Sequence, residues 1–150
     1  MTDVVVRRAE RRDLPRLAEL MHEYVVDFYR QPEPDPQAMD RLREAMLEGN
    51  EGTQLVAEAD GDLAGFATIY FSRTTFTGDR IGIMNDLYVV ESHRGSGAAA
   101  ALFEACRAEC RSLDMTEMTW ETAPDNHRAQ RFYEKVGGRR EDWLVYSIEP

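Results

Sequence analysis

A glycine turn beside an arginine is the part of the sequence best suited to bind a ligand. The stretch His93-Arg94-Gly95-Ser96-Gly97-Ala98-Ala99 stands between an apolar run and an alanine-rich segment that favours a helix. Gly95 and Gly97 permit positive φ, so several backbone N–H groups can point at one spot. Such donors, together with the helix dipole and the charge of Arg94, favour an anion. An ordinary strand-to-helix connection is the alternative interpretation.

The spacing of these glycines argues against the two commonest nucleotide-binding motifs. It is neither GxGxxG after a first strand nor GxxxxGK[ST], and no acidic residue closes a βαβ unit about 20 residues further on. The sequence therefore predicts a phosphate-bearing ligand of another kind.

The elements that must position this turn follow from hydrophobic periodicity and turn signals. We expect strands at residues 4–8, 55–59, 63–71, 81–90, 118–122 and 143–148, and helices at 14–28, 39–49, 98–108 and 127–136. Asp60-Gly61 predicts a hairpin, and three prolines between residues 32 and 36 predict a stiff loop. The expected fold is a mixed α/β (α+β) domain over residues 1–150, with a mostly antiparallel sheet of about six to seven strands and about four helices.

Composition limits the classes of partner. A formal charge of −10 argues against nucleic acid, and 43% hydrophobic residues without a long apolar run argue against a membrane span. The first residues lack an export signal, so we expect a cytoplasmic protein. Cys106 and Cys110 share the apolar face of one predicted helix and should be buried, reduced thiols. The three histidines are scattered, and no metal is predicted.

Two motifs together resemble one enzyme superfamily. Arg94-Gly95-Ser96-Gly97-Ala98-Ala99, between a strand and an alanine-rich helix, resembles the acyl-CoA site of the GNAT superfamily of N-acetyltransferases. The block from Asn126 to Gly137 resembles the superfamily's second landmark, N-x-x-A-x-x-[FL]-Y-x-x-x-G. The resemblance covers essentially the whole chain and is greatest for the branch that acetylates polyamines and other small amines, with histone-tail-type members nearby.

The resemblance implies a set of contacts with acetyl-CoA. Backbone N–H groups of the glycine turn would hold the pyrophosphate, and the strand around Tyr88 would pair with the pantetheine amides. One N–H of that strand would polarise the thioester carbonyl, and Asn126 would hydrogen-bond the cofactor arm. The implied cofactor-binding residues are Leu87, Tyr88, Val89, Arg94, Gly95, Ser96, Gly97, Ala98, Ala99, Asn126, Ala129, Phe132 and Lys135.

The resemblance also suggests how protons move. Tyr133 would protonate the departing thiolate, although its place on an apolar helical stripe is equally typical of a core tyrosine. Many polyamine-type relatives have Glu where this sequence has Asn85, and Asn cannot accept a proton. Asp86 is expected to point to the opposite face of the strand. The predicted route for the proton is therefore a water chain that ends on Asp86, on Glu121, or on an acid of the first helix such as Glu23 or Asp27.

The resulting hypothesis is direct acetylation of a primary amine on a small cationic substrate, such as a polyamine, diamine, amino acid or aminoglycoside-like compound. Candidate substrate-binding residues are Asp27, Phe28, Tyr29, Asn85 and Glu121. The alternatives are acetylation of a protein or peptide amine and an inactive acyl-CoA sensor. A homodimer is compatible with the resemblance, and the sequence leaves that point open.

Overall fold

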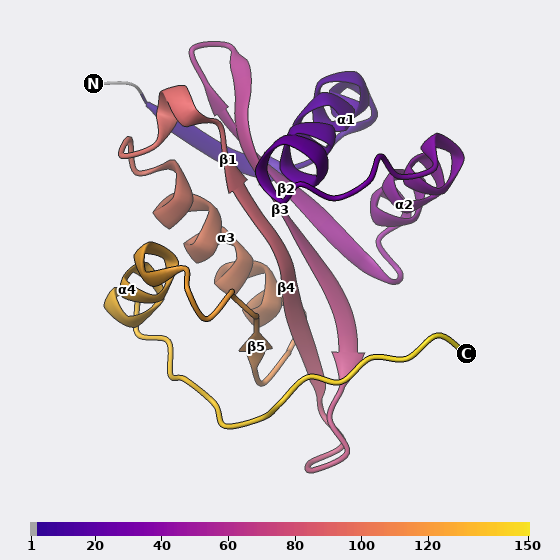
Figure 1. Cartoon of the computed structure of the whole chain (residues 1–150), viewed down its shortest axis with the longest axis vertical. Helices are drawn as coiled ribbons and strands as arrows, with labels where there is room; N and C mark the ends of the chain where they lie inside the picture. The colour runs from indigo at the N-terminus through magenta and orange to yellow at the C-terminus, as the bar shows by residue number, and fades with distance from the viewer. Residues whose placement is uncertain (1–2) are drawn as a thin grey trace. The chain divides into compact units, whose positions relative to one another are not determined.

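The strands form one mixed sheet in the order of the chain. The structure is a computed structural model that describes residues 3–150. Over those residues the strands are β1 (Val4–Arg8), β2 (Gly52–Ala59), β3 (Asp62–Arg73), β4 (Arg80–Val89) and β5 (Met118–Thr119). Neighbours from β1 to β4 pair antiparallel, and β5 pairs parallel with β4 (Figure 1). The predicted mixed sheet is therefore confirmed.

Four α-helices accompany the sheet over the described residues. They are α1 (Leu14–His22), α2 (Pro36–Glu48), α3 (Ala98–Ser112) and α4 (His127–Lys135). A π-helical segment, η2 (Glu23–Phe28), extends α1, and short 3₁₀ turns η1 (Arg11–Asp13) and η3 (Glu91–His93) precede α1 and α3. The chain divides into two compact units, Met1–Trp120 and Glu121–Pro150, and we describe each by itself.

Local sequence signals explain where several elements begin and end. Asp35 accepts a hydrogen bond from Gln37 N at 3.2 Å and caps α2, and Gly49 ends that helix with φ +79°. Asp60 and Gly61 have φ of +54° and +79°, as a two-residue hairpin turn of type I′ requires. The predicted hairpin between β2 and β3 is confirmed.

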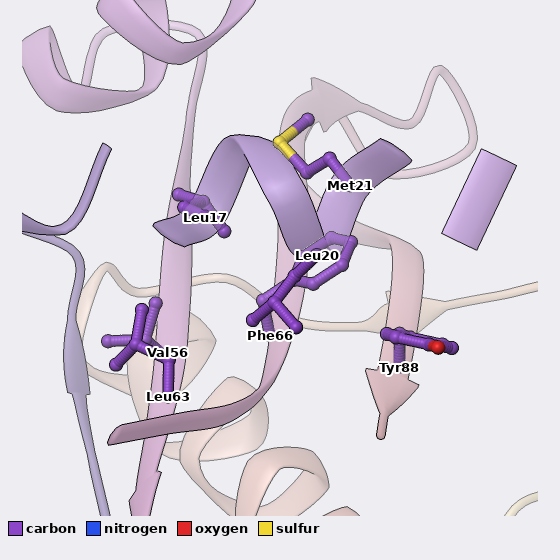
Figure 2. Close-up of a cluster of buried hydrophobic side chains, with 7 residues drawn as sticks. All are labelled: Leu17, Leu20, Met21, Val56, Leu63, Phe66 and Tyr88. Atoms are coloured by element: carbon purple, nitrogen blue, oxygen red, sulfur yellow. The ribbon is translucent and has the colours of Figure 1, made fainter. Parts of the chain in front are cut away.

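The main core lies between α1 and the strands. Leu17 and Leu20 from α1 meet Val56 and Phe66 from the sheet, with Tyr88 of β4 at the edge of the cluster (Figure 2). Removing such side chains from water is the largest favourable contribution to folding. Tyr88 therefore links the packing of α1 to the strand that precedes the glycine turn.

On the other face of the sheet, α3 packs against β4. A Cβ at Gly82 would lie 2.5 Å from Cys110 Sγ, so glycine is what allows this close approach. Cys106 and Cys110 are buried free thiols, as predicted, and burial raises the pKa of Cys106 to about 12. These thiols act as small apolar groups in the interface between helix and sheet.

The sheet is smaller than the sequence predicted. It has five strands over the described residues instead of six or seven, and β5 spans two residues where 118–122 were expected. Residues 143–148, the predicted closing strand, form no strand. Their run of aromatic, β-branched and aliphatic residues indicates β propensity, but a strand also needs a partner for its backbone groups. In the unit from Glu121 onward, α4 is the only helix or strand.

A buried ion pair joins β1 to the start of α1. Arg7 Nη1 and Nη2 donate to the carboxylate of Asp13 at 2.7 and 2.9 Å, and Glu10 N donates to the same group at 2.7 Å. The hydrogen bond from Arg7 holds the pKa of Asp13 below its ordinary value. The charged carboxylate is therefore stabilised in the folded state.

Replacing Asp13 should make the free energy of unfolding less dependent on pH in the acid range. Because the pKa of Asp13 is lower in the folded state than in the unfolded chain, its ionised carboxylate stabilises the fold above the unfolded-state pKa. This stabilisation is lost as pH falls through the folded-state pKa. We expect Asp13→Asn to lower the free energy of unfolding near pH 6 by roughly 1–3 kcal/mol. The difference from the unsubstituted protein should shrink toward pH 2, as measured by urea unfolding. A constant difference across this range would contradict the assignment.

Candidate active site

The glycine turn after β4 has the backbone geometry of an anion-binding loop. Gly95 and Gly97 have φ of +82° and +92°, and Gly97 precedes the first residue of α3. The first intrahelical bond runs from Ala101 N to Gly97 O at 3.0 Å, so the N–H groups of residues 98–100 lack an intrahelical partner. No acidic side chain stands in the first turn of α3. These donors fit a phosphate group.

The edge of β4 beside the turn is open within the first unit. Val90 N donates to Ala64 O on β3 at 2.9 Å, so alternation turns the backbone groups of Leu87 and Val89 away from β3. On that side β5 pairs with β4 only at Gly82 and Ile83. The N–H groups of Leu87 and Val89 are thus the ones that can pair with an extended ligand. The backbone of Tyr88 faces β3 instead.

The side chain of Arg94 lies away from the glycine turn and on the side of α1. Its Nε donates to Val89 O at 3.1 Å, and its guanidinium carbon stands 5.5 Å from the ring centroid of Phe28 and 5.9 Å from that of Tyr88. These cation–π contacts favour this position. Arg94, Phe28 and Tyr88 line an open cavity of about 540 Å³, together with residues that include Arg16, Glu23 and Asp27.

Another hollow in the first unit, about 660 Å³, lies between α2 and β3 and is lined by residues such as Arg41, Met46, Tyr70 and Phe71. None of the predicted catalytic, cofactor-binding or substrate-binding residues lines it. The chemistry that the sequence predicted is therefore not located there.

A β-bulge in β4 brings Asn85 and Asp86 together. Asp86 pairs with Thr68, but the next pair is Met84 with Ile69, so Asn85 is the extra residue. Asn85 is exposed and its Nδ2 donates to Asp86 Oδ1 at 3.1 Å. The expectation that Asp86 lies on the face opposite Asn85 is thus wrong at this point, because a bulge interrupts the simple alternation of a strand.

The carboxylate of Asp86, on β4, is half-buried. Burial raises its pKa above the ordinary value of an aspartate, while hydrogen bonds from Thr68, Tyr24 and Asn85 lower it. Burial is the larger effect. A carboxylate in such a place takes up a proton more readily than one in water.

The π-helical turn η2 gathers aromatic rings next to this carboxylate. Tyr29 N donates to Tyr24 O at 3.1 Å, a bond that spans five residues, and the two rings meet edge-on at 4.9 Å. Phe28 contacts Tyr29 at 5.0 Å and Tyr88 at 6.1 Å. Of the predicted substrate residues, Phe28 and Tyr29 therefore belong to the ring cluster, and exposed Asp27 lines the cavity beside them.

Two residues of this cluster were not predicted as part of the site. Tyr24 lies inside the helix predicted at 14–28 and was given no role in the site, yet its hydroxyl interacts with Asp86. Thr68 is fully buried on β3 and does the same. No local pattern in the sequence marks either residue, because both contacts join segments far apart in the chain. Glu23, which accepts from Tyr88 Oη at 3.1 Å, was weighed as a distant acid.

In the second unit Asn126 begins α4. Its Oδ1 accepts from Ala129 N at 3.1 Å, which is a helix N-cap. Tyr133 is half-buried and its ring lies 5.5 Å from that of Phe132, while Lys135 and Glu121 are exposed. Gly137, at φ +97°, follows the end of the helix. The structure thus gives Asn126 a capping role that the sequence did not predict.

Residues 3–150 contain no group of three or more His, Cys, Asp or Glu side chains arranged to hold a metal ion. No helix in this range combines the length and apolar character needed to cross a membrane.

Comparison with known proteins gives one family. A family model described as the Acetyltransferase (GNAT) family matches residues 17–138. "Uncharacterized N-acetyltransferase YhfO" of Bacillus subtilis (strain 168) is 31% identical over 141 residues, covering 94% of this chain and 93% of that protein. "D-amino-acid N-acetyltransferase HPA3" of Saccharomyces cerevisiae (strain ATCC 204508 / S288c) is 37% identical over 87 residues, covering 58% and 53%.

The fold is shared with solved acetyltransferases. A structure of the aminoglycoside N-acetyltransferase AAC(6')-Iy in complex with CoA has a TM-score of 0.84 and 19% identity, covering 99% of this chain and 96% of that chain. The family model spans most of the sequence, and the Bacillus protein matches almost from end to end. The chain therefore belongs to the GNAT family and is an N-acetyltransferase that uses acetyl-CoA.

Proposed function

We propose that the chain acetylates the primary amine of a small cationic substrate, such as a polyamine, diamine, amino acid or aminoglycoside-like compound. The observation that carries this proposal is the half-buried carboxylate of Asp86 next to Tyr24, whose ring packs against that of Tyr88, which Phe28 contacts in turn. A carboxylate next to aromatic faces suits an ammonium group, which both attract. Relatives named for D-amino acids and aminoglycosides fit a small amine, whereas a relative named for alanine of a ribosomal protein fits the alternative of a protein amine.

The cofactor would be held by backbone groups of this chain. The N–H groups of the turn from Arg94 to Ala99 would bind the pyrophosphate, and those of Leu87 and Val89 would pair with the pantetheine arm. When bound, acetyl-CoA supplies the acetyl group as an activated thioester. The N–H of Leu87 lies next to Asp86 in the chain, so it is the donor that we assign to the thioester carbonyl.

Two side chains would move protons. Asp86 would take a proton from the incoming ammonium, so that the amine nitrogen presents a lone pair. The Oη of Tyr133 would donate a proton to the leaving thiolate. Such a transfer is accessible because the ordinary pKa values of a phenol and a thiol differ by only about 1.5. Glu23, Asp27 and Glu121 are the further acids that we assign to attraction of the cationic substrate.

The test is release of free thiol from acetyl-CoA across a panel of amines. We expect turnover with polyamines, diamines, amino acids or aminoglycosides, and little with a peptide of similar charge. Turnover only with the peptide would favour a protein amine as acceptor. Acetyl-CoA binding without thiol release on any acceptor would favour the sensor hypothesis.

The remaining expectations concern the assembly and the place of the reaction. We propose that residues 1–150 work as one catalytic domain in the cytoplasm, and that the chain can form a homodimer. The Bacillus relative, whose match covers 94% of this chain and 93% of that protein, supports the single domain. Sedimentation of the protein with and without acetyl-CoA tests the dimer.

A pair of substitutions at Asn126 separates its capping role from cofactor binding. Asp keeps the oxygen that accepts from Ala129 N but loses the two amide donors. We expect Asn126→Asp to leave the free energy of unfolding almost unchanged and to weaken acetyl-CoA about tenfold. Asn126→Ala should show the same loss of affinity and also lose about 1 kcal/mol of stability. Calorimetric binding and urea unfolding measure both. Unchanged affinity in the Asp variant would leave capping as the role of this residue.

A further inference from the structure

Asp86 needs a route by which its proton reaches water, and its neighbours decide what that route is. This inference rests on the proposed function, in which the carboxylate gains a proton in every turnover. Asp86 is half-buried; its Oδ1 accepts from Asn85 Nδ2 at 3.1 Å, and the hydroxyls of Thr68 and Tyr24 interact with the carboxylate. Enclosed groups exchange protons through hydrogen-bonded chains of polar neighbours.

Tyr24 is the neighbour that leads away from the sheet. Its ring packs edge-on against Phe66 and Tyr88, at 5.6 Å from each ring centroid, so it is held in one position. Its hydroxyl interacts with the carboxylate of Asp86 and with the hydroxyl of Tyr29. Burial and the nearby charge of Asp86 raise the pKa of Tyr24, so the phenol stays protonated and can donate and accept at once.

Tyr29 connects Tyr24 to the solvent. Its side chain is 46% exposed, and its ring meets that of Tyr24 at 4.9 Å and 84°. Residues five apart point in different directions on an α-helix, but the wider winding of the π-helical turn η2 places them on one face. The π-turn is therefore the local structure that makes the pair.

The other polar groups around Asp86 offer no equivalent route. Thr68 is fully buried and its Oγ1 accepts from Gln54 Nε2 at 3.1 Å. Asn85 is exposed, but an amide does not exchange its protons as a hydroxyl does. Tyr70 of β3 interacts with Asp86 only through charge. Burial and that charge raise the pKa of Tyr70, and no hydrogen bond joins the two side chains.

We propose that Tyr24 and Tyr29 form a proton relay from Asp86 to the solvent. With Asp86 ionised, Tyr29 donates to Tyr24 and Tyr24 donates to the carboxylate. Once Asp86 holds the proton taken from the substrate ammonium, both hydroxyls rotate to accept from the side of Asp86. The proton of Asp86 then passes to Tyr24 Oη, that of Tyr24 to Tyr29 Oη, and that of Tyr29 to water. The carboxylate and both phenols return to their starting protonation, and one proton has left.

Tyr29→Phe is the variant that tests the exit, because it keeps the contact between Tyr24 and Asp86. We expect its kcat to fall about fivefold in dilute buffer with little change in KM for the amine. A small buffer acid–base pair such as imidazole at high concentration should restore kcat by taking the proton directly. A purely structural or substrate-binding role of Tyr29 predicts no restoration by buffer.

Tyr24→Phe tests the inner step with a readout that does not require turnover. Loss of its hydroxyl removes a donor to the carboxylate, so the pKa of Asp86 should rise, as followed by carbon NMR of the ligand-free protein. Tyr29→Phe should leave that pKa almost unchanged, and Tyr70→Phe is the matched control with unchanged kcat. Full kcat of Tyr29→Phe in dilute buffer, or no shift in Tyr24→Phe, would overturn the relay. The proposed function has a separate test in Asp86→Asn: loss of activity in that variant together with full kcat of Tyr29→Phe in dilute buffer would overturn the relay and leave the proposed function standing.

Discussion

Replacing Asp86 with Asn should lower kcat/KM for an amine substrate by about 10²- to 10⁴-fold at neutral pH, the usual range for loss of a positioned general base. Asn keeps the size of the side chain and can still bond to Thr68 and Tyr24, so the fold should persist. What it loses is the ability to take the proton of an ammonium. The loss should therefore fall as pH rises toward the pKa of the amine, where the substrate arrives already neutral.

The same substitution should make the protein more stable near neutral pH. Burial raises the pKa of Asp86, so the folded state binds its proton more tightly than the unfolded chain does. This tighter proton binding adds to the free energy of unfolding. The contribution is fully present below about pH 3.9, the pKa of Asp in the unfolded chain, and is lost as pH rises through the pKa of Asp86 in the folded state. Asn cannot ionise, so the variant avoids that loss. The sign is opposite to that at Asp13, where an arginine lowers the pKa.

Urea unfolding between pH 3 and pH 8, with thiol release on the same samples, measures both effects. Glu104→Gln, an exposed carboxylate on α3, is the control that should change neither. An Asp86→Asn variant within about threefold of full activity would show that another group accepts the proton. A variant less stable than the parent at pH 8 would show that the hydrogen bonds of the carboxylate outweigh its burial.

The sequence predicted the elements that depend on short-range chemistry. Asp60-Gly61 gave the hairpin because both positions need positive φ, and the glycine turn at 95–97 has the predicted backbone for the same reason. The amphipathic period of residues 14–28 predicted the first helix but not its π-helical end. Tyr24 and Phe28 of that π-helical turn contact Tyr88 of β4, and a periodicity contains no information about such a contact.

The errors arose where two distant segments decide the outcome. Residues 143–148 have a strand pattern without a strand partner, and Asn85 forms a bulge that depends on the register with β3. Arg94 shows the same limit. Its position in the sequence predicted a charge near a bound phosphate, but its guanidinium lies over Phe28 and Tyr88, which come from two other elements. Side-chain destinations depend on tertiary contacts, and those determine how the candidate site is assembled.

Tyr133 provides the second large effect. It is half-buried on α4 beside Phe132, in the helix that Asn126 caps. Both interpretations of the sequence, core tyrosine and proton donor, are compatible with this environment. Tyr133→Phe separates them, because it keeps the ring and its packing and removes only the hydroxyl. If the hydroxyl protonates the leaving thiolate, kcat should fall about 10²-fold.

The accompanying measurements identify the step that is lost. Acetyl-CoA affinity and the free energy of unfolding should stay close to those of the parent, so the change should lie in kcat and not in KM. The defect should be smaller with an acyl donor whose thiol has a lower pKa, since such a thiolate leaves without a proton. Tyr146→Phe, an 89% exposed tyrosine in the same unit, is the matched control. A Tyr133→Phe variant with full kcat and a lower free energy of unfolding would identify Tyr133 as a core residue.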